Sequence, residues 1–280
     1  RNKEIVPLKL LLIVLVFTSS SFISIGLLTH EKNGFPQRIV TNIDWSTQSA
    51  SPLRSKCHSK KIPCEYFGNS VEWATFGDSH VVELSYALAD SLKEKDIGVQ
   101  QNSFTSCRPS SLTNTSSPCH DWKQSTLERL IKSDTIKNIV VSYRLTAYLY
   151  GESYRHYPAL PDIKTEDERN IIWNDLVLIL DKLSQSGKRV YFVVQPPELP
   201  LYLEELVFWN LKPNENIKGV SRSWWNKRNS FVTERLKDIN KDVIIVDIIN
   251  QFCNQTQCYG NDSQGYYYTD HNHVSIYGAS

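Results

Sequence analysis

The chain has 280 residues and a formal net charge of +1, with 31 lysine and arginine residues against 30 acidic ones. It has no dense basic patch, and this balance argues against a nucleic-acid-binding protein. The chain begins with Arg1 and contains no methionine, so we expect it to be part of a longer protein. Its seven tryptophans suit a domain that handles sugars, although most of these rings are expected in the core.

The first predicted element is a transmembrane helix in residues 1–29. The run Leu10 to Leu28 carries no charge and is about long enough to cross a hydrocarbon core of ~30 Å. Basic residues at positions 1, 3 and 9 precede it, so the positive-inside rule places the residues after about 29 outside the cytoplasm. A signal peptide is the alternative, with residues 19–21 as a small-residue cleavage zone.

Residues 30–56 are polar and contain Gly34, Pro36 and Pro52, which predicts an extended extracytoplasmic linker. Residues 57–280 then form one domain of ordinary size. The six cysteines fall into local pairs, and an even set in an exported domain predicts the disulfides Cys57–Cys64, Cys107–Cys119 and Cys253–Cys258. Free buried thiols and a zinc site are the alternatives, but neither C-x-x-C nor H-x-x-x-H occurs, so no metal is expected.

Within the domain, short apolar runs alternate with helical patterns. Strands are predicted at 71–76, 98–104, 138–143, 189–194 and 243–247, and helices at about 81–95, 166–186 and 223–240. This alternation predicts an α/β fold, a three-layer α/β/α sandwich with a mostly parallel five-stranded sheet. Functional loops are then expected at the carboxyl ends of the strands.

A candidate nucleophile follows the first of these strands, in Gly77-Asp78-Ser79-His80. A serine needs a base within hydrogen-bond reach and a group that orients that base. Asp270 and His273 are three residues apart, a spacing that places both side chains on one face of a helical turn. We therefore predict Ser79 as nucleophile, His273 as base and Asp270 as the orienting carboxylate. For either motif alone, a simple turn is the alternative.

Three residues next to the predicted triad are not expected to take part in the reaction. Asp78 is expected to brace the turn by accepting backbone hydrogen bonds. His80 and His271 are rival bases by proximity. His80 follows the nucleophile directly and should point away from Ser79, and His271 should face elsewhere on the turn of His273.

These motifs resemble the first and last sequence blocks of the SGNH hydrolase superfamily, G-D-S and D-x-x-H. The run from His273 to Ala279 continues the likeness as H-x-S-x-x-G-A. The segment Ser106-Cys107-Arg108-Pro109, and a strand that ends in Arg144, narrow the resemblance to one family. It is the extracytoplasmic SGNH domain fused to integral-membrane acyltransferase family 3 proteins, and the likeness covers roughly residues 57–280.

The resemblance implies an O-acyltransferase that acetylates a cell-surface polysaccharide, such as the O-antigen of lipopolysaccharide, through an acyl-serine. It implies a bacterial inner-membrane protein with this domain in the periplasm and an acyltransferase membrane region upstream in the same chain. The domain would bind no cofactor, and the acetyl group would come from acetyl-CoA through the membrane region. A membrane-tethered carbohydrate acetylesterase and a non-catalytic glycan-binding module with a decayed site are the alternatives.

The chain departs from the SGNH pattern at the oxyanion hole. That pattern uses the serine N–H, a glycine after the second strand and an asparagine after the third. Here the second strand is followed by Thr105-Ser106-Cys107-Arg108, without glycine, and Arg144 stands where the asparagine is expected. The N–H of Ser106 or Cys107 and the guanidinium of Arg144 are the candidate donors. A structural ion pair is the alternative for Arg144.

Overall fold

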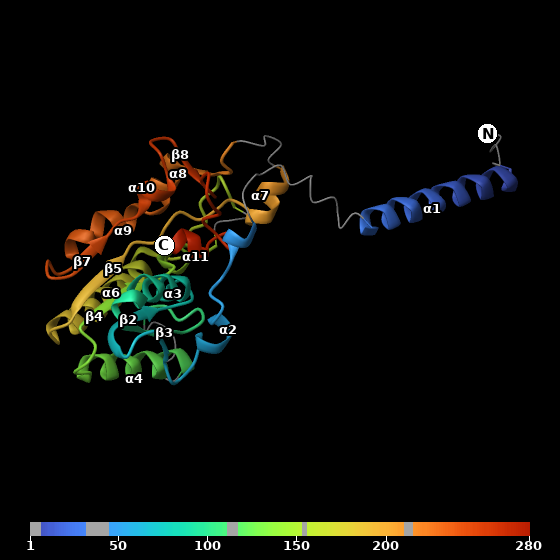
Figure 1. Ribbon diagram of the computed structural model, residues 1–280. Helices are drawn as coiled ribbons and strands as arrows, with labels where there is room; N and C mark the ends of the chain where they lie inside the picture. The colour runs from blue at the N-terminus through green and yellow to red at the C-terminus, as the bar shows by residue number, and fades with distance from the viewer. Residues whose placement is uncertain (1–6, 32–44, 111–116, 153–155, 210–214) are drawn as a thin grey trace.

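The computed structural model describes residues 7–31, 45–110, 117–152, 156–209 and 215–280. Helix α1 (Leu8–Glu31) is long and apolar enough to span a membrane, and none of its residues is buried (Figure 1). A signal sequence has the same properties, so α1 is compatible with a membrane anchor or a signal sequence. Residues 1–6 of the predicted membrane segment and 32–44 of the predicted linker lie outside the described residues.

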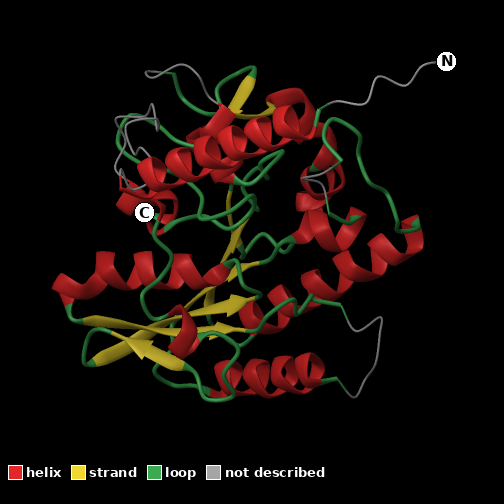
Figure 2. Cartoon of the chain, turned by 90° about the vertical axis from the view of Figure 1, so that its right-hand side faces the viewer, coloured by secondary structure: helices red, strands yellow, loops and turns green. Residues whose placement is uncertain are grey.

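A six-stranded sheet forms the centre of the domain, in the order β1-β3-β2-β4-β5-β7. Figure 2 shows strands, in yellow, with helices on either side of them. Five of its strands pair in parallel and lie where the sequence predicts strands, and β1 adds an antiparallel edge beside β3. The mostly parallel α/β architecture is therefore as predicted, with one additional strand. The strands are β1 (Cys64–Tyr66), β2 (Ser70–Gly77), β3 (Ile97–Ser103), β4 (Asn138–Ser142), β5 (Arg189–Val193) and β7 (Ile244–Val246).

Helices cover both faces of this sheet. Alternate side chains of a strand point to opposite faces, so a strand with apolar side chains on both needs a helix layer on each. In β2, Ala74 and Phe76 enter the core shared with α4 (Pro118–Lys132), α5 (Leu145–Tyr150) and α6 (Glu166–Gln185). Thr75 points the other way, and its hydroxyl lies 2.6 Å from that of Ser85 in α3 (Val81–Leu92). Strands buried on both faces read as nearly continuous apolar runs, which is why the sequence reveals them.

A second core surrounds the small antiparallel sheet of β6 (Lys218–Ser221) and β8 (Gln257–Tyr259). The helix predicted at 223–240 is divided there into α8 (Arg222–Arg228), α9 (Ser230–Arg235) and the 3-10 turn η4 (Leu236–Asp238). Asn229 leaves the helical conformation and ends α8. The remaining helices are short: α7 (Leu203–Trp209), α10 (Ile249–Phe252), α11 (Ile276–Ala279) and the 3-10 turn η3 (Lys93–Lys95).

The three disulfides join Cys57 to Cys64, Cys107 to Cys119 and Cys253 to Cys258, the pairing that the sequence predicts.

The end of the predicted linker packs on the domain. After the turn η2 (Trp45–Gln48), the carbonyl of Ser49 accepts a bond from the N–H of Ile276, at 3.0 Å. In α2 (Arg54–Cys57), Arg54 pairs with the buried Glu83 of α3 at 2.6 Å. Residues at the end of the predicted linker therefore contact the domain directly.

Candidate active site

Ser79 lies at the carboxyl end of β2, in the turn that leads into α3. Gly77, the last residue of β2, pairs with Ser142 at the end of β4. A Cβ atom at position 77 would lie 1.9 Å from the carbonyl oxygen of Ser142, so only glycine allows this close approach. The glycine of Gly-Asp-Ser-His thus lets β2 and β4 end side by side, at the sheet edge where Ser79 projects.

The buried carboxylate of Asp78 holds this turn in place through hydrogen bonds. Its side chain is 1% exposed, and its carboxylate accepts hydrogen bonds from the N–H of His80, the N–H of Arg144 and the hydroxyl of Tyr148. Burial opposes ionisation, but the charge of His80 and these hydrogen bonds together lower the pKa of Asp78. Asp78 therefore braces the loops after β2 and β4, the role expected from the sequence.

The structure brings Ser79, His273 and Asp270 together. The hydroxyl of Ser79 lies 2.8 Å from Nε2 of His273, and Nδ1 of His273 lies 2.7 Å from Oδ2 of Asp270. The carboxylate therefore accepts a hydrogen bond from Nδ1–H of His273 and leaves Nε2 free to accept the proton of the serine. This is the contact geometry of a serine nucleophile with its base and orienting acid.

The Asp270–His273 segment is a bend, not the helical turn assumed from its spacing. Oδ1 of Asp270 accepts the N–H groups of Asn272, at 2.8 Å, and His273, at 2.7 Å, and so closes the turn itself. Helix α11 begins only at Ile276. Its N-cap Ser275 accepts the N–H of Gly278, where a Cβ would lie 2.1 Å from the carbonyl oxygen of Tyr267. These contacts explain the serine and glycine that follow the histidine in the last block.

Burial, and after it the charge of His80, lowers the pKa of His273, against the opposing effect of its bond with Asp270. Asp270 is also held ionised, because its hydrogen bond and charge interaction with His273 outweigh the effect of burial and lower its pKa. A neutral imidazole beside an ionised carboxylate is the state that a general base requires.

The two rival histidines take different places. The ring of His80 stacks on that of His273, with centroids 4.5 Å apart and planes inclined by 26°, and its Nδ1 lies 3.3 Å from Asp78. His271 points to Arg144 and Glu152, at 3.4 and 3.6 Å. Neither is placed as the base of Ser79. The motif did not predict the stacked ring of His80, since the stacking depends on a contact between residues 193 positions apart in the chain.

The charges that face His273 make its protonation sensitive to His80. Asp270 raises the pKa of His273, whereas His80 and Arg54 lower it. His80→Phe keeps a stacked ring without the charge, so we expect the pKa of His273 to rise and the acidic limb of kcat/KM to move to higher pH. A pH profile of p-nitrophenyl acetate hydrolysis measures this shift. An acidic limb that stays at the wild-type pH would show that His80 only fills space.

Backbone N–H groups of Ser79 and Ser106 are the candidate oxyanion donors. Neither has a hydrogen-bond partner among the described residues, whereas the N–H of Cys107 bonds to the carbonyl of Phe104 at 3.2 Å. Ser106 has a φ of 51°, in the left-handed region that favours glycine. The chain thus places a serine in a conformation that suits the glycine of the SGNH pattern, and the prediction for Cys107 is not supported.

The guanidinium of Arg144 is occupied by carboxylates. Its Nε donates to Oε1 of the buried Glu198 at 2.8 Å, and its two Nη atoms donate to Glu152 at 2.6 Å each. Burial alone would lower the pKa of Arg144, but the charges of Glu198 and Glu152 raise it. The structure therefore corrects the prediction of Arg144 as an oxyanion donor in favour of its alternative, a structural ion pair. Only its backbone N–H, bound to Asp78, reaches the nucleophile turn.

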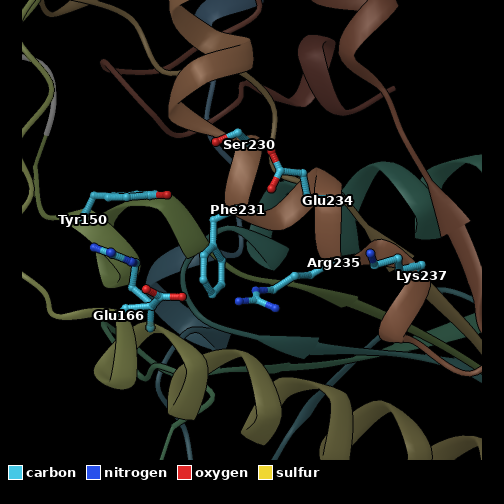
Figure 3. A pocket seen from close by; sticks show the side chains of 8 residues that line it. Tyr150, Glu166, Ser230, Phe231, Glu234, Arg235 and Lys237 are labelled. Atoms are coloured by element: carbon cyan, nitrogen blue, oxygen red, sulfur yellow. The ribbon is translucent and has the colours of Figure 1, made fainter.

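Figure 3 shows a different cavity, of about 320 Å³, that contains no member of the triad. A guanidinium covers each of its two rings, Arg169 at 5.2 Å from that of Tyr150 and Arg235 at 4.4 Å from that of Phe231. Its lining consists of Tyr150, Glu166, Arg169, Ser230, Phe231, Glu234, Arg235 and Lys237. The described residues contain no cluster of side chains suited to a metal ion.

Comparison with known families agrees with this geometry. The model of the SGNH domain, described as fused to AT3 domains, matches residues 50–280. The chain belongs to this SGNH family. Membership places it among serine-dependent acyl hydrolases and transferases, and the match includes the part of the predicted linker that packs on the domain.

Solved structures with a similar fold include two esterases. The aryl esterase of M. smegmatis has 13% identity and a TM-score of 0.34, over 64% of this chain and 84% of that one. A carbohydrate acetylesterase from Sinorhizobium meliloti has 13% identity and a TM-score of 0.38, over 75% and 93%. No curated protein matches the chain.

Proposed function

We propose that this SGNH domain transfers an acetyl group to a hydroxyl of a cell-surface polysaccharide, such as the O-antigen of lipopolysaccharide, through an acetyl-Ser79 intermediate. The observation that supports acyl chemistry most directly is the continuous contact from Ser79 through His273 to Asp270. Transfer to a sugar, in place of hydrolysis, rests on the family, whose SGNH domains are fused to AT3 domains. An AT3 region would deliver the acetyl group from acetyl-CoA, at the periplasmic side of the inner membrane.

In the first half-reaction, His273 takes the hydroxyl proton of Ser79 while Oγ attacks the acetyl carbonyl. The oxyanion of the tetrahedral intermediate receives hydrogen bonds from the N–H groups of Ser79 and Ser106. The bond to the donor then breaks, and His273 returns the proton to the leaving group. In the second half, the sugar hydroxyl gives its proton to His273 and attacks the acetyl carbon, and Ser79 leaves and regains its proton.

The acyl-enzyme can be tested directly by mass spectrometry of the full chain in detergent micelles after a brief exposure to p-nitrophenyl acetate. We expect one added acetyl group, on the peptide that contains Ser79, and none in Ser79→Ala. Acetylation that persists in Ser79→Ala, or wild-type turnover without any adduct on Ser79, contradicts the proposal. An adduct that water discharges as fast with sugars present as without them would favour the carbohydrate acetylesterase.

A further inference from the structure

A groove of about 540 Å³ lies where α2 meets the loop after β3. One wall is formed by residues 51–59, which run from the end of the predicted linker past Cys57, and the other by Thr105 of the loop after β3. The lining includes Ser51, Arg54, Ser55, His58, Ser59 and Thr105.

This groove is next to the catalytic turn. Gly77 and Ser103 are the last paired residues of the parallel strands β2 and β3, and the N–H of Phe104 bonds to the carbonyl of Gly77 at 3.2 Å. Ser79 and Thr105 each lie two residues beyond that pair, so their loops leave the sheet side by side. The charge of Arg54, which lines the groove, contributes to lowering the pKa of His273. This interaction also indicates that the groove lies near the triad.

The wall of the groove is firmly held. His58 bridges the hydroxyls of Ser103 and Thr105, with its two ring nitrogens at 2.9 and 2.8 Å from them. Burial, and then the charge of Arg54, lowers the pKa of His58 to about 4, so the ring is neutral at ordinary pH. Ser59 adds a bond between its hydroxyl and the N–H of Thr105, at 2.8 Å. A preformed wall costs little conformational entropy when a ligand binds.

The chemistry of the lining is that of a sugar site. It contains four serine and threonine hydroxyls and the guanidinium of Arg54, with no carboxylate and no large apolar side chain. The hydroxyls of Ser59 and Thr105 also bond to each other, and Arg54 also pairs with Glu83, so these groups would bind a ligand in addition to their partners in the domain. Hydroxyl groups donate and accept hydrogen bonds, as the hydroxyls of a pyranose do. The lining also exposes carbon atoms, against which the apolar face of a sugar ring can pack. The groove is therefore suited to a sugar ring, which has both hydroxyl groups and an apolar face.

We propose that this groove binds a sugar ring of the acceptor and presents one of its hydroxyls to acetyl-Ser79. The inference rests on the proposed function and specifies where its second substrate sits. It also gives a role to residues 51–59, because the segment that connects the domain to α1 forms the acceptor wall.

Two neighbouring residues of α2 provide the test. Ser55 lines the groove and Lys56 does not, and both are exposed. A tryptophan at either position adds the same bulk to the same helix, but only Ser55→Trp fills the groove. The full chain in detergent micelles would receive p-nitrophenyl acetate as donor. The methyl pyranosides of glucose, galactose, mannose and rhamnose would serve as acceptors.

The measured quantity is acetylated glycoside, by mass spectrometry, per p-nitrophenolate released. We expect Ser55→Trp to lower this ratio at least tenfold for the best acceptor, and Lys56→Trp to match the wild type. The burst of p-nitrophenolate counts the folded, reactive molecules of each variant, so misfolding does not imitate the result.

One outcome overturns the inference while leaving acetyl transfer in place: an equal ratio in Ser55→Trp and Lys56→Trp, with transfer to at least one of the four sugars. A failure of the proposed function looks different. It would appear as a burst that survives in Ser79→Ala, or as an ordinary burst with no transfer to any of the four sugars.

Discussion

Asp270→Asn is expected to lower kcat for acyl transfer by about 10³- to 10⁴-fold without unfolding the domain. Oδ1 of Asp270 accepts two backbone N–H groups, and an asparagine oxygen can keep both bonds. Its amide nitrogen then faces Nδ1 of His273, where Oδ2 now lies at 2.7 Å. An amide donates there and does not accept, so it forces the imidazole proton onto Nε2. A protonated Nε2 cannot take the proton of Ser79.

Asp262→Asn is the matched control for this prediction. Asp262 also accepts two backbone N–H groups in a nearby turn, those of Gln264 at 2.8 Å and Gly265 at 3.0 Å, but it bonds to Tyr277 and not to the triad. We expect that variant to keep activity close to wild type. Steady-state hydrolysis of p-nitrophenyl acetate gives kcat for both. If Asp270→Asn retains more than a tenth of the wild-type kcat, Asp270 does not set the tautomer of His273.

Most of the sheet could be predicted because β2, β4, β5 and β7 are short, largely apolar and separated by helical patterns. Such runs are legible when both faces of a strand are buried, as in β2 and β4. The edge strand β1 was missed, since Cys64–Tyr66 is too short to show any period. The small β6/β8 sheet was missed for the same reason. Asn229 divides a helix whose apolar pattern continues across it, and periodicity does not register such a break.

The three reactive groups could also be predicted, because each lies in a short motif with its own local chemistry. The contacts of Arg144 could not, because its partners Glu152, Glu198 and His271 come from three separate loops. Only the fold brings these loops together. The position of Arg144 at the end of a strand suggested that it faces a ligand, but that position alone could not predict its ion pair with the buried Glu198.

The turn of Asp270 shows a further limit of spacing. Residues three apart share a face on a helix, and here the two side chains meet without a helix. The carboxylate of Asp270 brings the two side chains into contact itself. Its Oδ1 accepts the backbone N–H of His273, and its Oδ2 accepts a hydrogen bond from the imidazole ring. The predicted contact is therefore present for a different structural reason, which is the side chain's own hydrogen bonds.

Glu198→Ala is expected to lower the free energy of unfolding by about 3–5 kcal/mol, the usual cost of removing one partner of a buried ion pair. Glu198 is 1% exposed and accepts the Nε–H of Arg144 at 2.8 Å. The alanine leaves the mostly buried guanidinium of Arg144 without its internal counter-charge. For a domain of this size, that loss corresponds to a fall in Tm of about 10 °C. Thermal unfolding of the full chain in detergent, followed by circular dichroism, would measure it.

Glu152→Ala separates the buried charge from the exposed one on the same arginine. Glu152 also bonds to Arg144, but its side chain is 49% exposed, so water can replace it at a cost of about 0–1 kcal/mol. Glu198→Gln keeps the shape and an acceptor oxygen while it removes the charge, and its loss should fall between the two alanine variants. Equal losses in Glu198→Ala and Glu152→Ala would mean that burial does not govern this pair. If the loss in free energy of unfolding is largest for Glu198→Ala, intermediate for Glu198→Gln and smallest for Glu152→Ala, the buried charge pair governs stability here. Arg144 then links the loop after β4 to the loop after β5 through Glu198, and its N–H links both to the turn of Ser79 through Asp78.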